Sequence, residues 1–149
     1  MRPDASVSCA DAPRRPALAV VALTLLVFDT LALFFAAALH VQGVHIPLGS
    51  AAFDEAQIVP AAIVEGLAGG LFAVATIMVL FNRRGMWWMA LVAHVFAILG
   101  FLLGLFATRN GTSPFNRAYH LVLLGVFVVG PAFLLAPATR DALGHRREA

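Results

Sequence analysis

Three ionisable side chains, Asp29, Glu65 and His94, lie inside long apolar segments of the sequence. An ionisable side chain in a lipid bilayer is costly unless it is paired, hydrated or neutralised. Carboxylates and imidazoles can pair with one another and exchange protons. If the three face the interior of one bundle, they form a polar core that moves or senses protons or a small solute, by relaying protons or by coupling them to the solute. The alternative is structural, because a buried acid also holds helices together by hydrogen bonds.

The depth of each side chain follows from its position in its segment. At about 1.5 Å per helical residue, Asp29 lies roughly 15 Å, Glu65 roughly 8 Å and His94 roughly 20 Å from the outer ends of their segments. These depths differ by one or two helical turns. Glu65 and His94 also stand beside or among small residues, which favours an inward direction for both.

Histidines form a second set of candidates near one border of the apolar segments. His40 and His120 lie at similar depth on two different segments, and His45 follows in the loop. Two imidazoles facing each other across a four-helix bundle can ligate haem b. Histidine with a carboxylate can instead hold zinc or copper. Haem b or a divalent metal therefore stays open as a cofactor, although histidines also occur at membrane borders without any ligand.

The elements that must position these residues are long apolar segments. Of the 149 residues, 61% are hydrophobic and 12% are charged, whereas a soluble domain has about 45–50% and about 25%. Each segment has the ~20 residues that cross a bilayer as a helix. We therefore predict an all-α, integral membrane four-helix bundle over residues 17–137, with four spans: 17–39, 60–81, 86–107 and 118–136.

The arginines indicate how the four spans are oriented. All ten basic residues are arginine, and eight of them fall in the tails 1–16 and 138–149 or in the loop after the second span. Basic residues are retained on the cytoplasmic side. We expect antiparallel, up-down spans with both termini cytoplasmic, and an outer loop over 40–59 that contains a short interfacial helix. The rich use of Arg, Ala and Gly is typical of a GC-rich bacterial genome, which places the chain in a bacterial inner membrane.

Small residues at four-residue intervals predict how the helices pack. Gly66 and Gly70 lie on the second span, and Gly100 and Gly104 lie on the third. Such pairs let helix backbones approach closely, either within one chain or against a second membrane protein. The glycine faces therefore also suit a homo-oligomer or another membrane-protein partner. A non-catalytic accessory subunit of a larger membrane complex is an alternative function. The sequence shows no motif for nucleotide binding, for hydrolysis or for binding nucleic acid, so it favours a non-enzymatic role in the lipid bilayer.

Overall fold

The computed structural model describes residues 14–48, 51–107, 109 and 114–144. Most of the predicted N-terminal tail and the last five residues of the C-terminal tail lie outside these residues. The elements are, in order, α1 (Arg14–Gln42), β1 (Val44–Leu48), β2 (Ala51–Glu55), α2 (Val59–Leu80), α3 (Met86–Ala107), α4 (Pro114–Leu135) and α5 (Pro137–Gly144).

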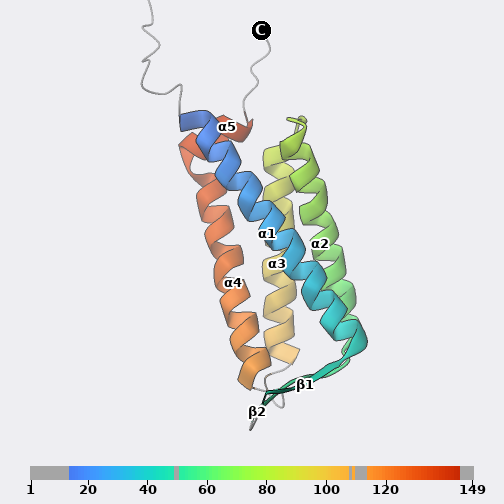
Figure 1. Ribbon diagram of the computed structural model, residues 1–149. Helices are drawn as coiled ribbons and strands as arrows, with labels where there is room; N and C mark the ends of the chain where they lie inside the picture. The colour runs from blue at the N-terminus through green and yellow to red at the C-terminus, as the bar shows by residue number, and fades with distance from the viewer. Residues whose placement is uncertain (1–13, 49–50, 108, 110–113, 145–149) are drawn as a thin grey trace, which may run out of the picture.

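Four of the helices, α1 to α4, are long and apolar enough to cross a membrane. They pack side by side into one bundle, with α1 against α2, α2 against α3 and α3 against α4 (Figure 1). The spans predicted over 17–39 and 86–107 fall wholly within helices, and the other two run only one residue past a helix end. A helical bundle with four candidate spans is therefore confirmed, with a two-stranded hairpin added to it.

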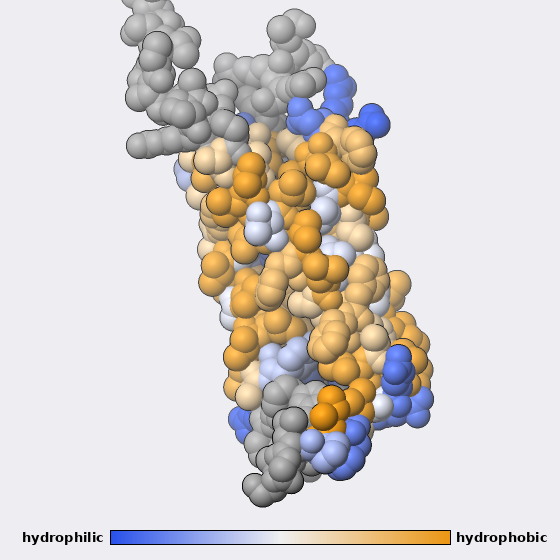
Figure 2. Space-filling view, viewed as in Figure 1, coloured by the Kyte–Doolittle hydropathy of each residue, from blue (hydrophilic) through white to orange (hydrophobic). Residues whose placement is uncertain are grey.

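The exterior of the bundle is apolar along most of its length. Figure 2 shows hydrophobic side chains over the middle of the visible face and hydrophilic side chains near its ends. Each long helix contributes large exposed apolar residues, such as Leu31, Leu67, Leu103 and Val122. Contiguous apolar surface on this scale is rare on soluble monomers, and it fits a multi-pass membrane protein.

The hairpin lies at one end of the bundle, and the start of α1 and helix α5 lie at the other (Figure 1). We call these the hairpin end and the tail end. At the tail end α5 packs against α1, α3 and α4 and buries Thr139 and Leu143. The Trp87 indole Nε1–H donates to the Leu134 carbonyl at 2.8 Å, and the Arg140 guanidinium lies 5.3 Å from the Trp87 ring. The predicted polar tail therefore begins as a helix, because Leu143 joins the apolar core.

The connection between α1 and α2 is a hairpin, so the helix predicted within the outer loop is wrong. Strands β1 and β2 pair antiparallel, from Val44 opposite Glu55 to Leu48 opposite Ala51. The Ile58 N–H also donates to the His40 carbonyl at 2.9 Å, which joins the end of α1 to the start of α2. A ladder satisfies backbone groups in both halves of the loop. One short helix would leave the first half without these partners.

Candidate functional site

A buried acid–imidazole pair lies near the hairpin end of the bundle. His40 comes from the last turn of α1, and Glu65 comes from the second turn of α2. His40 Nδ1 lies 2.6 Å from Glu65 Oε2, with the two residues 2% and 5% exposed. This hydrogen bond gives each buried polar group a partner, without which burial would cost free energy. The structure thus pairs Glu65 with His40, whereas the prediction from the sequence placed Glu65 in one cluster with Asp29 and His94.

The pair lines a pocket of about 200 Å³ that is reached by residues of all four long helices. His40 and Glu65 form one part of its wall, and His120 of α4 forms another. The aromatic ring of Phe101 on α3 is also part of the lining. Most of the space exists because small residues of α2 and α3 face it: Ala61, Ala68, Ala97, Gly100, Gly104 and Ala107. The structure therefore brings His40, His120 and Glu65 to a single pocket.

His120 is held against α3 by the absence of a side chain at Gly104. A Cβ built at Gly104 would stand 3.0 Å from His120 Nε2, closer than nearly all such contacts. The imidazole also packs on Phe101, with ring centroids 5.2 Å apart, and on Tyr119 at 5.3 Å. His120 is only 6% exposed as a result.

The other three glycines that were predicted to let helices pack closely differ in how near a neighbouring helix comes to them. A Cβ at Gly100 would lie 2.9 Å from Val64 Cγ1, so this glycine brings α3 close to α2. A Cβ at Gly66 or Gly70 would meet nothing within 4 Å. Gly66 and Gly70 therefore have no close packing role between the described residues of this chain.

The second acid–imidazole pair joins α1 to α3 near mid-bundle. His94 Nε2 lies 3.4 Å from Asp29 Oδ2, and both residues are 2% exposed. His94 Nδ1 lies 2.7 Å from the Ala90 carbonyl oxygen, so Nδ1 carries the hydrogen and donates it. A neutral His94 would then turn the lone pair of Nε2 toward the carboxyl group. One further proton must lie on Asp29 or on Nε2 to make this contact attractive.

The surroundings of His94 leave its ring little freedom. The Phe72 ring packs edge-on against it at 4.7 Å between centroids. On the α4 side the ring fills the space above Gly130, where an added Cβ would overlap imidazole atoms. Side chains or backbone from four helices therefore surround this one imidazole.

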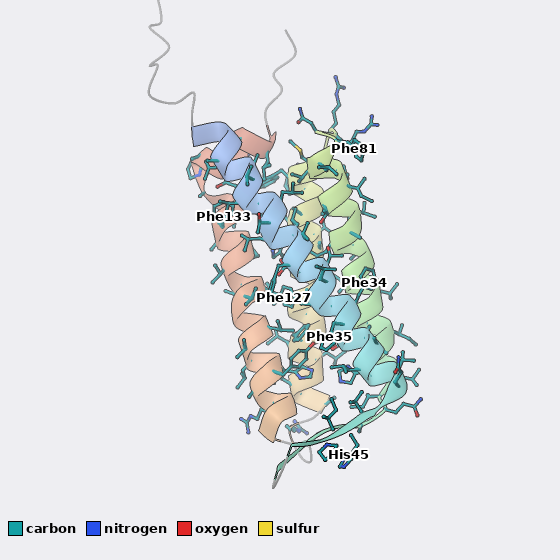
Figure 3. All side chains as sticks on the ribbon, viewed as in Figure 1. Phe34, Phe35, His45, Phe81, Phe127 and Phe133 are labelled. Carbon is teal, nitrogen blue, oxygen red and sulfur yellow. The ribbon has the colours of Figure 1, made fainter. Side chains whose placement is uncertain are left out.

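The two pairs are separated along the bundle and do not form one cluster. His40 follows Asp29 by eleven residues on α1, which corresponds to about 16 Å along the helix. Three buried rings, Phe72, Phe127 and Phe101, contact one another in series, with centroids 5.7 Å and 5.2 Å apart. We call them the aromatic layer, and Phe127 marks its place inside the bundle in Figure 3. The layer links the His94 surroundings to the pocket. It could not be predicted from the sequence, because nothing distinguishes these three among the twelve phenylalanines.

His45 is not part of the pocket. It is exposed on β1, and Figure 3 shows it on the hairpin. Among the residues that the structure describes, no group of three or more His, Cys, Asp or Glu side chains could hold a metal ion. The geometry therefore offers His40 and His120, without His45, as the histidines of a common site.

Comparison of the chain with known protein families, with curated proteins and with solved structures found no match.

Proposed function

We propose that the chain is a multi-pass protein of a bacterial inner membrane, with antiparallel spans and both termini in the cytoplasm. Arg83, Arg84 and Arg140 belong to the tail end and support a cytoplasmic position for it. The pocket then lies toward the outer side of the membrane.

We further propose that the protein moves protons, alone or with a small solute, through its polar core. The observation that carries this proposal is the buried His40–Glu65 pair in the wall of a pocket that His120 shares. An imidazole and a carboxylate in short contact can accept a proton from the pocket side and release it again. The Asp29–His94 pair is a second proton-holding position deeper in the bundle.

Passage between the two positions requires a second conformation, because the aromatic layer fills the space along the way. Helix α4 supplies Phe127 to this layer and contains Gly130 followed by Pro131. A proline inside a helix removes one backbone hydrogen bond and favours bending at that point. We place the rearrangement that opens the layer at these two residues.

The test is proton flux into vesicles that contain the purified protein and a trapped pH-sensitive dye. A potassium diffusion potential set with valinomycin drives protons inward, and we expect wild-type vesicles to acidify faster than protein-free ones. Glu65→Gln keeps the shape of the side chain but removes its exchangeable acid, so its flux should fall to the protein-free level. Asp141→Asn alters an exposed acid on α5 and should behave as wild type. Wild-type flux in Glu65→Gln, or no flux in wild type, contradicts the proposal.

A haem b site is the second candidate function, favoured by the shared position of His40 and His120. A haem macrocycle is larger than the pocket of about 200 Å³, so its binding would require the helices around the pocket to separate. When His40 donates Nδ1–H to Glu65, its Nε2 is the nitrogen that can ligate iron, and carboxylates commonly orient ligating imidazoles in this way. Among the described residues no set of three or more His, Cys, Asp or Glu could hold a metal ion, whereas haem iron needs only two imidazoles, so the geometry favours haem over a divalent metal ion. A Soret band that is present in wild type and lost in His120→Ala supports haem. No such band after expression with adequate haem rules it out.

A further inference from the structure

We propose that the pocket binds a lipid-soluble molecule that consists of one ring with a single hydroxyl group, and that this molecule enters from the membrane. The inference rests on the proposed function, because it names the class of solute that would meet the His40–Glu65 pair.

The size of the pocket fits one ring. Its volume is about 200 Å³, and an apolar cavity of about 150 Å³ takes up one benzene molecule. The additional space accommodates a few further atoms. The small side chains on α2 and α3 leave this space open, and Phe101 offers an aromatic surface on which a ring can pack.

The chemistry of the wall limits the ligand to one polar group. Polar side chains come only from His40, Glu65 and His120, and the rest of the lining is apolar. A sugar, an amino acid or a hydrated ion would press its other polar groups against alanine, leucine and phenylalanine, where they have no hydrogen-bond partners. A hydroxyl both donates and accepts, so it suits the pair in either state of protonation, whereas a carbonyl only accepts.

The wall of the pocket continues into the lipid-facing surface. Leu103 lines the pocket and is 62% exposed, and Pro60 and Ala107 line it and are also exposed. Leu103 belongs to the apolar exterior that the bundle presents along its length. A molecule already dissolved in the outer half of the bilayer can therefore enter the pocket beside Leu103 without first crossing water.

The test compares p-cresol with toluene, which has the same ring and methyl group but no hydroxyl. The whole chain, with 15N-labelled histidines, is titrated in detergent with each compound, and concentrations are expressed as mole fractions in the micelle. We expect p-cresol to shift the His40 and His120 imidazole signals in a saturable way. Toluene should need about five- to tenfold more for half-saturation, as the loss of one hydrogen bond implies.

Two substitutions on α2 locate the binding. Ala61→Phe fills the pocket and should abolish the p-cresol response, whereas Ala73→Phe, outside the pocket and also half-buried, should leave it unchanged. Equal half-saturation by the two compounds, no histidine shift in wild type, or an undiminished response in Ala61→Phe overturns the inference. Vesicles report separately on the proposed function. Glu65-dependent proton flux without a p-cresol response removes only the ligand class, and a p-cresol response without flux removes only proton movement.

Discussion

Replacing Gly130 by alanine tests the close packing of His94 on α4. A Cβ at this position would overlap the imidazole, with three of its ring atoms within 4 Å. The imidazole has little room to move away from the added Cβ. Its Nδ1–H donates a hydrogen bond to the Ala90 carbonyl, and the Phe72 ring packs against it. Overpacking a well-filled site of this kind costs about 1–3 kcal/mol of unfolding free energy. We expect Gly130→Ala to destabilise the protein by that amount.

Gly125 provides the matched control on the same helix. It is exposed, and an added Cβ would meet nothing within 4 Å. In an open helical position alanine is favoured over glycine by up to about 1 kcal/mol. The two variants should therefore differ by about 1–4 kcal/mol. Reversible unfolding by sodium dodecyl sulfate in mixed micelles, followed by circular dichroism, measures the difference.

A double-mutant cycle with His94→Ala separates two costs of Gly130→Ala. One is the overlap with the His94 ring, and the other is the cost of a Cβ in the residue before Pro131. Gly130 precedes Pro131, and a residue with a Cβ is disfavoured in the helical conformation before proline. That cost remains when the imidazole is absent, whereas the overlap disappears. We expect Gly130→Ala to be markedly less costly in the His94→Ala background. Equal costs in both backgrounds would refute the packing argument.

Two further substitutions test the aromatic layer and the tail end. Phe101→Ala removes one ring of the layer and should raise proton flux into vesicles above wild type, whereas Phe133→Ala, partly buried beside the core, should not. Equal flux in the two would show that the layer is no barrier. Trp87→Phe loses the hydrogen bond to the Leu134 carbonyl and should cost about 0.5–1.5 kcal/mol. Trp88→Phe, which is exposed, should change the unfolding free energy by less than about 0.5 kcal/mol, and an equal loss in both variants would contradict a specific role for the bond.

The four helices could be predicted from the sequence because the bilayer thickness sets a minimum length for apolar segments. The start of α2 at Val59, beside Pro60, follows from the tolerance of helix starts for proline. The turn after α2 contains Asn82 and Gly85, both with positive φ, which also follows local rules. These features depend on composition over long stretches or on strong local preferences.

The partners of the ionisable residues were harder to predict. We predicted one cluster of Asp29, Glu65 and His94 because all three lie in apolar segments. In the structure, each acid instead pairs with a histidine of similar depth. Glu65, roughly 8 Å deep, meets His40 near the border, while Asp29 and His94, at roughly 15 and 20 Å, meet each other. Depth could have separated the two pairs. The small residues beside Glu65 and His94 indicated an inward direction, and both side chains are buried. Their partners could not be predicted from periodicity, because apolar residues occupy every face of these helices and leave no clear period.

In the hairpin and α5, tertiary contacts determine the secondary structure of short segments. Residues 50–59 carry polar and acidic residues that fit the start of a helix, yet 51–55 pair with β1. The segment after Pro137 looks polar, yet it folds because Thr139 and Leu143 find buried positions at the tail end. Local preference in such short segments is weak compared with the contacts that the bundle offers.

The central claim is that Glu65 exchanges its proton in partnership with His40 at the pocket. Infrared difference spectroscopy between acidic and basic pH tests this directly, because a carboxyl group that changes protonation gives a C=O band. We predict a band that is absent in Glu65→Gln, changes frequency in His40→Ala and stays unchanged in His94→Ala. A Glu65 band that responds to His94→Ala but not to His40→Ala, or no Glu65 band at all, would contradict the account.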